Sequence, residues 1–239
     1  MAVRIRGKEK VPGLLQEASA YLLDANHPAL YQWPALGQAT HAVKNLEIGS
    51  GRGTFLATMA QRNSDQLFLG VDLYIPIVAR AATLLREFAC PNAKLVCIHA
   101  ERLPEFLAQI KFDRLYLNFS DPWPRRRNDR KRLTHPRFLE RYRSFLKQDG
   151  HLEFKTDNLS LFDYSVQTLV ASGWTLLEET RDLSVAKDEF ELCEGRYVQT
   201  EYEQKFRALG QPICHLVAQP PMRDELSGVR SHTPRHSGI

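Results

Sequence analysis

Val43-Lys-Asn-Leu-Glu47-Ile-Gly49-Ser-Gly51-Arg-Gly53 is the stretch that decides the fold. Its first part, Val43–Ile48, is apolar enough for a buried strand, and three glycines follow at alternate positions. Glycine adopts backbone angles that other residues avoid, so such a loop can turn tightly and bring its backbone close to a ligand. Thr54–Arg62 then has the pattern of a helix. A strand, a glycine loop and a helix in this order indicate a nucleotide-type cofactor site.

The rest of the chain continues the alternation of strands and helices. This pattern predicts an α/β, Rossmann-like fold with a mostly parallel seven-stranded sheet and helices on both faces. The further predicted strands are Leu67–Asp72, Ala93–Ile98, Arg114–Phe119, His151–Lys155, Trp174–Glu179 and Ile213–Ala218, and the further helices are Ile75–Phe88, Leu103–Gln109, Pro136–Leu146 and Leu159–Ala171.

The length of 239 residues fits one large α/β domain better than two. Residues 1–42 are interpreted as an accessory segment with a helical pattern over Leu14–Leu23, and residues 43–219 as the main domain. Residues 220–239 are poor in large apolar side chains, which predicts a disordered tail. The four cysteines lack the spacing of a disulfide framework or a zinc site, and no signal peptide or membrane span is recognisable. We therefore expect a cytoplasmic protein without a bound metal.

Acidic residues around the glycine loop separate two classes of cofactor. A dinucleotide fingerprint would place glycine or alanine at position 54, where this chain has Thr54. Glu47 would repel a pyrophosphate but attract a cation or a ribose, and Asp72 stands at a strand end where a carboxylate can bind ribose hydroxyls. The combination favours S-adenosylmethionine over NAD. The structural alternatives are a surface acid for Glu47 and a helix N-cap for Asp72.

Asp121-Pro-Trp-Pro-Arg-Arg-Arg-Asn-Asp-Arg-Lys-Arg132 is the second informative stretch. Prolines restrict the backbone and prevent a helix from starting, so Asp121 and Trp123 are expected in a stiff loop. Six of the last eight residues of the stretch are basic, although the net charge of the whole chain is only +4. Such concentrated positive charge favours contact with RNA or DNA over a solvated surface loop. Trp123 could stack on a base or pack within the protein.

Five polar residues fall at or just past the ends of predicted strands. Ligands of open parallel sheets bind beyond the carboxyl ends of the strands, so these side chains are expected along one rim. The residues are Glu47, Asp72, His99, Asp121 and Asp157. Lys155, two residues before the last of them, is interpreted as a snorkelling strand residue without a role.

Together these motifs resemble the bacterial tRNA (guanine-N7-)-methyltransferase family, whose members are class I S-adenosylmethionine-dependent methyltransferases. The similarity covers about residues 45–217, most of the chain. The motifs that carry it are Glu47-Ile-Gly-Ser-Gly-Arg-Gly-Thr-Phe55, Gly70-Val-Asp72, Asp121-Pro-Trp-Pro-Arg125, Arg130-Lys-Arg-Leu133, Phe154-Lys-Thr-Asp-Asn158 and Thr200-Glu-Tyr-Glu-Gln-Lys-Phe206.

The resemblance implies methyl transfer from S-adenosyl-L-methionine to N7 of guanosine 46 in the variable loop of tRNA, with Asp121 as the catalytic acid residue. It implies tRNA as the partner, with no membrane and no obligatory protein partner, in a monomer or homodimer. The implied cofactor pocket is Glu47, Gly49, Gly51, Gly53, Asp72, His99 and Asp121. The implied substrate residues are Arg125, Asp157, Thr200, Glu201, Tyr202 and Glu203, and the implied RNA contacts are Arg127, Asn128, Asp129, Arg130, Lys131 and Arg132.

The chain departs from the usual family pattern at three positions. Asp72 stands where glutamate is usual, His99 where aspartate or asparagine is usual, and Arg125 where lysine is usual. The first change shortens the reach of the carboxylate, the second changes the group expected near the adenine, and the third keeps the charge but alters its geometry.

Three alternative interpretations accompany this assignment. A methyltransferase of small molecules or proteins would need a closed apolar pocket, and the basic run argues against it. An inactive RNA-binding protein on the same scaffold is disfavoured by the intact glycines and acids, although fold alone does not separate the three functions. For Thr200–Glu203, a capping box at the start of a helix is the alternative to substrate contact.

Overall fold

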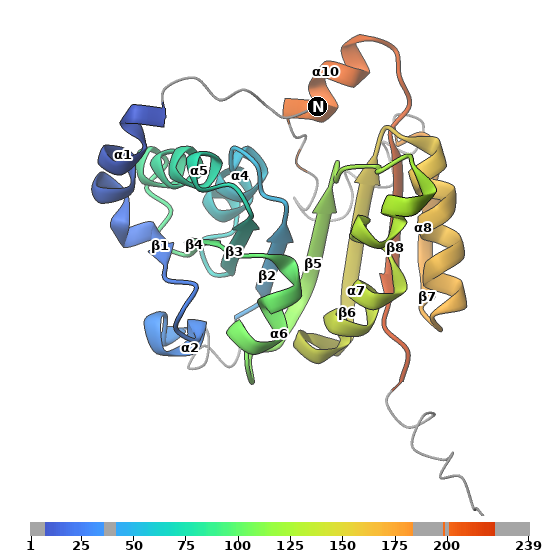
Figure 1. Ribbon diagram of the computed structural model, residues 1–239, viewed down its shortest axis with the longest axis horizontal. Helices are drawn as coiled ribbons and strands as arrows, with labels where there is room; N and C mark the ends of the chain where they lie inside the picture. Colours follow the sequence, from blue (N-terminus) through green and yellow to red (C-terminus); the bar gives the residue numbers. More distant parts are fainter. Residues whose placement is uncertain (1–7, 36–41, 184–197, 199–200, 223–239) are drawn as a thin grey trace, which may run out of the picture.

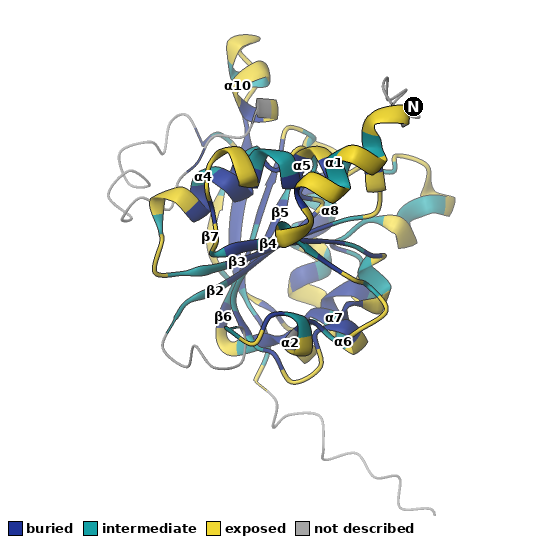
Figure 2. Ribbon diagram, turned by 90° about the vertical axis from the view of Figure 1, so that its left-hand side faces the viewer, coloured by how far each residue is buried: buried dark blue, intermediate teal, exposed yellow. Residues whose placement is uncertain are grey.

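The computed structural model describes residues 8–35, 42–183, 198 and 201–222, which form one sheet with helices on both faces (Figures 1 and 2). Thr200 and, from position 223 onward, the predicted tail lie outside the described residues. Within the described residues the sheet has eight strands in the order β1-β4-β3-β2-β5-β6-β8-β7. They are β1 (Leu22–Leu23), β2 (Lys44–Ile48), β3 (Leu67–Asp72), β4 (Ala93–Cys97), β5 (Phe112–Asn118), β6 (Leu146–Thr156), β7 (Thr175–Thr180) and β8 (Cys214–Gln219).

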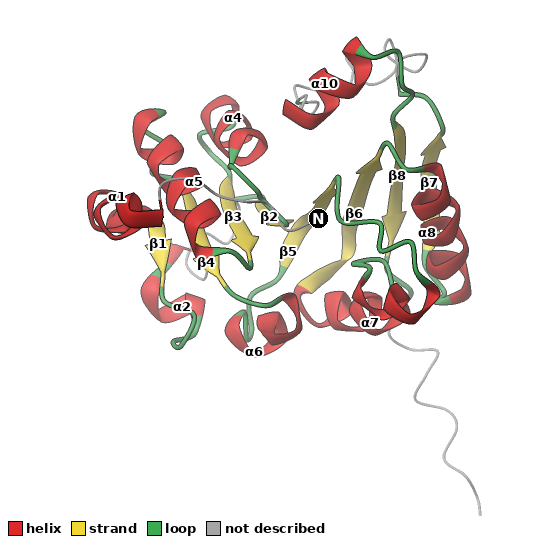
Figure 3. Ribbon diagram, turned by 45° about the horizontal axis from the view of Figure 1, so that its top comes forward, coloured by secondary structure: helices red, strands yellow, loops and turns green. Residues whose placement is uncertain are grey.

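The larger helices cover the two faces of the sheet in two groups (Figure 3). Helices α4 and α5 pack on one face, with α1 against α5, and α6, α7 and α8 pack on the other. None of the described helices is long and apolar enough to cross a membrane. The helices are α1 (Val11–Glu17), α2 (Ala29–Gln32), α4 (Thr54–Arg62), α5 (Ile75–Glu87), α6 (Leu103–Phe106), α7 (Pro136–Phe145), α8 (Leu159–Ala171) and α10 (Glu201–Ala208), with short 3-10 turns η1 (Lys8–Lys10), η2 (Ser19–Tyr21), η3 (Ala100–Arg102) and η4 (Arg126–Lys131).

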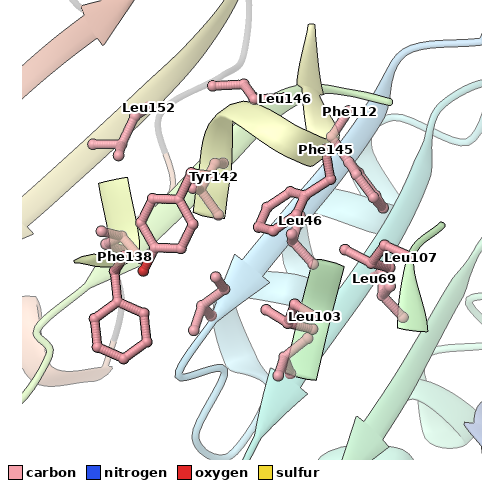
Figure 4. Packing of buried hydrophobic residues seen from close by; sticks show 14 of the residues in the cluster. Leu46, Leu69, Leu103, Leu107, Phe112, Phe138, Tyr142, Phe145, Leu146 and Leu152 are labelled. Carbon is pink, nitrogen blue, oxygen red and sulfur yellow. The ribbon is translucent and has the colours of Figure 1, made fainter. Parts of the chain in front are cut away.

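Apolar side chains from the central strands meet the helices in a hydrophobic core. Leu46 of β2 and Leu69 of β3 are fully buried and belong to one cluster with Leu103 of α6 and Tyr142 of α7 (Figure 4). Burying a large apolar side chain contributes about 1.5–3 kcal/mol, so this layer accounts for much of the stability of the sheet. The strands are therefore fixed firmly enough for their carboxyl ends to position a site.

The predicted class is confirmed, and the seven predicted strands are all present. The eighth strand, β1, comes from the lead-in segment, where Leu22 and Leu23 pair in parallel with Leu95 and Val96 of β4. The helical prediction for Leu14–Leu23 was wrong at its end: α1 stops at Glu17, the 3-10 turn η2 covers Ser19–Tyr21, and Leu22–Leu23 form β1. Pairing with the open edge of β4 favours an extended backbone at these last two residues. The division of the chain at residue 43 stays a prediction.

Strands β1 to β6 pair in parallel, and β8 pairs antiparallel with both β6 and β7. From β2 the chain runs outward through β3 to β4 and then returns to β5 on the other side of β2. In an open α/β sheet, ligands bind at such a reversal of strand order, beyond the carboxyl ends of the strands. The expected crevice therefore lies where β2 and β5 end, at the upper edge of the sheet in Figure 1.

Candidate active site

The glycine loop lies directly over the end of β2. All three glycines of the loop have left-handed φ angles: 85° at Gly49, 53° at Gly51 and 82° at Gly53. Residues with a Cβ adopt such angles only at a cost in free energy. The N–H groups of Gly49 and Ser50 both donate to the carbonyl oxygen of Val71, at 2.8 and 3.0 Å. The loop is thus folded tightly against β3, and α4 begins immediately after it.

Gly53 is the glycine that sequence and packing both require. A Cβ built at this position would lie 2.8 Å from the Cβ of Ala81 on α5. Gly53→Ala is therefore expected to destabilise the protein by about 2–4 kcal/mol, from the left-handed backbone and the overlap together. Gly13→Ala is the matched control, since a Cβ there meets nothing within 4 Å and alanine favours helix α1. Equal melting temperatures for the two variants would contradict the assignment.

Glu47 is buried at the carboxyl end of β2, so its interpretation as a surface acid was wrong. Its side chain is 3% exposed, and its Oε1 accepts a hydrogen bond of 2.9 Å from Nδ2 of Asn118 on β5. Its other carboxyl oxygen has no hydrogen-bond partner among the described residues. Burial raises the pKa of the Glu47 carboxyl to about 8. A buried polar atom without a partner is costly, which makes this oxygen a place for a ligand donor.

Asp72 joins the glycine loop to the end of β3. Its Oδ2 accepts from the N–H of Gly51 and its Oδ1 from the N–H of Tyr74, each at 3.0 Å. The N-cap position of α5 is occupied by Tyr74, whose side chain makes no capping hydrogen bond, so the interpretation of Asp72 as the N-cap residue was wrong. Burial raises the pKa of the Asp72 carboxyl, and the negative charge of Asp121 adds to this effect. The carboxylates of Asp72 and Asp121 thus lie close enough to interact, as the rim prediction requires.

His99 follows β4 on the same edge, but its side chain is exposed. Its Nδ1 accepts a hydrogen bond of 3.2 Å from the N–H of Glu101 and so caps the short turn η3. The side chain has a local structural partner, and its contact with an adenine stays a prediction.

The loop that carries Asp121 has a strained backbone and is held in place by hydrogen bonds. Phe119 and Trp123, which flank it, have left-handed φ angles of 51° and 42°. Such angles in residues other than glycine cluster at functional sites and persist only where the surroundings hold them. Arg132 supplies part of that support, because its guanidinium donates to the carbonyl oxygens of Pro122 at 3.0 Å and Trp123 at 3.2 Å. Asp121 itself is exposed at the rim.

The basic run is divided between structural and exposed residues. Arg132 holds the Asp121 loop and stacks on the Tyr164 ring of α8, and Lys131 lies over the Trp123 ring at 4.6 Å. The side chains of Arg125, Arg127 and Arg130 are exposed, whereas those of Asn128 and Asp129 are half-buried within η4. Exposed guanidinium groups around a fixed loop can bind phosphate groups.

A row of polar side chains crosses the α4 face of the sheet at its carboxyl edge. Glu47 of β2 is paired in register with Tyr116 of β5. Asn118, two residues after Tyr116 on β5, is paired with Lys155 of β6. Lys155 in turn pairs with His215 of β8. Residues that are paired in register, or two apart on one strand, face the same side of a sheet. Asp157 follows two residues later and is exposed at the rim.

Helix α10 lies over this edge of the sheet (Figure 1). Tyr202 stacks on Phe119 with ring centres 6.1 Å apart and is 60% exposed. Glu203 is instead fully buried, where its carboxylate pairs with Lys155 and Arg207. Because Glu203 is buried, its predicted role in substrate binding would be indirect: it would hold α10 in position. The N-terminal cap of α10, and with it Thr200 of the expected capping box, is outside the described part of the chain, and Glu201 begins the helix.

Comparison with known proteins places this chain in a family. A family model described as "Putative methyltransferase" matches residues 41–216. A tRNA (guanine-N(7)-)-methyltransferase of Lactobacillus johnsonii is 38% identical over 218 residues, covering 90% of this chain and 98% of its own. The chain belongs to the tRNA (guanine-N(7)-)-methyltransferase family. Another such protein, from Lachnoclostridium phytofermentans, is 40% identical over 174 residues, 73% of this chain and 79% of its own.

Solved structures agree on the fold of this family member. A structure described as that of an antibiotic related methyltransferase superposes with a TM-score of 0.57 over 80% of this chain and 92% of its own. At 16% sequence identity, this likeness shows the methyltransferase fold alone.

Two residues of this methyltransferase, Asn118 and Lys155, were not predicted as parts of the site, and Arg132 was predicted as an RNA contact but not in its structural role. Asn118 holds Glu47, Arg132 holds the Asp121 loop, and Lys155 pairs with Glu203. Asn118 and Lys155 carry a usable signal, because each is a polar residue on a strand that otherwise reads as buried. Arg132 carries none, since the sequence does not distinguish it from the arginines beside it.

Proposed function

We propose that the protein transfers the methyl group of S-adenosyl-L-methionine to N7 of guanosine 46 in the variable loop of tRNA. The observation that carries the proposal is the pinned Asp121 loop, which sets an exposed carboxylate beside Asp72 and the glycine loop at the switch point of the sheet. The names of the relatives support the substrate and the atom.

The residues present fit the cofactor. The buried, unpartnered oxygen of Glu47 suits a cationic or hydroxyl group, and the three left-handed glycines leave backbone free of side chains beside it. Asp72 would hold the ribose hydroxyls, a role that suits a carboxylate at the end of this strand. When bound, the cofactor supplies an electrophilic methyl group: the N7 lone pair of guanine forms the new C–N bond while the bond from sulfur to the methyl carbon breaks and leaves a neutral thioether.

Asp121 would orient the acceptor base. N7 of guanine has a lone pair and no proton, so no base is needed at that atom, and positioning supplies much of the acceleration. The Asp121 carboxylate can accept hydrogen bonds from N1–H and the exocyclic amine of guanine, and its charge stabilises the positive charge that develops on the ring. A guanine paired within folded tRNA must first be extruded, at a cost of a few kcal/mol.

Exposed arginines of the basic run would bind the tRNA backbone. Arg127→Gln with Arg130→Gln is expected to weaken tRNA binding and to reduce the slope of log Kd against log salt by about 1–2, because each phosphate contact contributes about 0.7–0.9. Arg62→Gln with Arg86→Gln is the matched control. It removes the same charge from the ends of α4 and α5, which lie near the amino edge of the sheet. An unchanged salt slope in the first double variant, measured by filter binding, would refute the RNA assignment.

Position 46 is tested with two unmodified tRNA transcripts that differ only there, one with guanosine and one with adenosine. We expect label from the methyl group of the cofactor in the first transcript alone. Equal labelling of both would overturn the position and leave the reaction itself standing.

A further inference from the structure

Lys155 is a buried lysine with an acidic partner. It is 5% exposed near the end of β6, and its Nζ lies 3.7 Å from Oε2 of Glu203 and 3.4 Å from the carbonyl oxygen of Val198. Burial lowers the pKa of Lys155, and the nearby Glu203 carboxylate opposes that shift. A buried charge is tolerated only with a partner, so the pair favours a state in which α10 is docked on the sheet.

The backbone of Lys155 contacts the other side of the site. Its carbonyl oxygen accepts a hydrogen bond of 2.9 Å from the N–H of Phe119, the left-handed residue two positions before Asp121. One residue therefore connects the Asp121 loop, through its backbone, with α10, through its side chain.

The contact between these two segments is completed by aromatic rings. Tyr202 stacks on Phe119 with an angle of 29° between the rings, and Phe206, one helical turn further, lies 5.7 Å from Tyr202. Tyr202 is 60% exposed, so a large part of its side chain faces solvent beside the Asp121 loop. Exposed aromatic faces of this kind bind the faces of nucleic-acid bases.

We propose that Lys155 is a positioning residue for the acceptor base: by pairing with Glu203 it docks α10, which holds the Tyr202 ring on Phe119 as a stacking surface beside Asp121. The inference rests on the proposed function, because it supposes that a guanine is bound at Asp121. The base would then be held at its edge by the carboxylate and on one face by the ring.

The test compares Lys155→Met with Lys147→Met in the full-length protein. Lys147 lies at the other end of the same strand and pairs with Asp113 in a partly exposed ion pair, so its loss removes a lysine without touching α10. We expect kcat for methylation of tRNA to fall on the order of 100-fold in Lys155→Met, the effect of a misplaced reacting group. Cofactor affinity, measured by calorimetry, should fall far less, and Lys147→Met should behave as the wild type.

Tyr202 provides a second test that does not depend on the stability of a buried variant. Tyr202→Ala is expected to lower kcat/KM for tRNA by roughly tenfold through lost stacking. Tyr202→Phe keeps the ring and should restore most of the activity, while the melting temperature stays the same in both variants. A purely structural tyrosine would not give this separation.

The outcomes distinguish the inference from the function on which it rests. If wild-type protein methylates tRNA and both Lys155→Met and Tyr202→Ala do so at the wild-type rate, the positioning role is wrong and the proposed function stands. If the wild type binds the cofactor but labels no tRNA, the proposed function is wrong, and this inference, which rests on it, is wrong as well. Equal losses of cofactor affinity and tRNA turnover in Lys155→Met, with full activity of Tyr202→Ala, would also overturn the positioning role.

Discussion

Asp121→Asn is expected to lower the rate of methyl transfer to tRNA by on the order of 100- to 1,000-fold, while tRNA binding stays intact. The replacement keeps the size of the side chain but removes the negative charge and one acceptor for the N–H groups of guanine. The loop should keep its shape, because Arg132 pins it through the backbone of Pro122 and Trp123 and not through Asp121. Single-turnover methylation with labelled cofactor measures the chemical step directly.

The control for this prediction is Asp65→Asn, an exposed acid in the turn between α4 and β3. It makes the same chemical change at the amino edge of the sheet and should leave both rate and binding unchanged. Wild-type turnover by Asp121→Asn would show that the carboxylate has no part in the reaction. Loss of tRNA binding in parallel with turnover would instead place Asp121 in general RNA recognition.

Glu47→Gln is expected to lower cofactor affinity and, at the same time, to stabilise the ligand-free protein above neutral pH. Burial raises the pKa of the Glu47 carboxyl to about 8, whereas an exposed glutamate in the unfolded chain has a value of about 4.3. Between these values the folded protein keeps a proton that the unfolded chain has released, so stability falls as pH rises through the window and levels off above it. The slope is at most about 1.4 kcal/mol per pH unit, and glutamine removes it.

Melting temperatures of the ligand-free wild type and Glu47→Gln, measured between pH 5 and pH 8.5, test this account. The advantage of the variant should grow with pH and reach a plateau near pH 8. For the wild type, cofactor binding should tighten over the same range, because an ionised Glu47 binds a cation better than a protonated one. A difference in melting temperature that is the same at every pH, or unchanged cofactor affinity in the variant, would contradict the role assigned to Glu47.

Local signals in the sequence predict most of the fold. The bounds of α4 and α8 agree with prediction, because Gly53 and Asn158 mark their starts and the apolar pattern is regular within them. Strand β6 is longer than predicted, since the polar stretch Lys147–Asp149 reads as a loop but follows Leu146, which pairs with Phe112 of β5. The two-residue strand β1 depends likewise on a partner distant in the chain.

The main acidic residues of the site were predicted from the sequence, but the contacts that hold the site together were not. Glu47, Asp72 and Asp121 were predicted on one rim because the fold class dictates where parallel strands end, and the structure places all three there. The burial of Lys155 depends on Glu203, 48 positions away, so no local pattern distinguishes it from a lysine that reaches solvent. The structural role of Arg132 could not be predicted from the sequence for the same reason. Its partners are carbonyl groups and an aromatic ring that only folding brings close to it.

Methyl transfer from labelled S-adenosyl-L-methionine to unmodified tRNA, followed by identification of the labelled nucleoside, is the most direct test of the central claim. We expect N7-methylguanosine from the variable loop, formed by the wild type and absent with Asp121→Ala. Label in a different nucleoside, or none in any RNA while the cofactor binds normally, would contradict it.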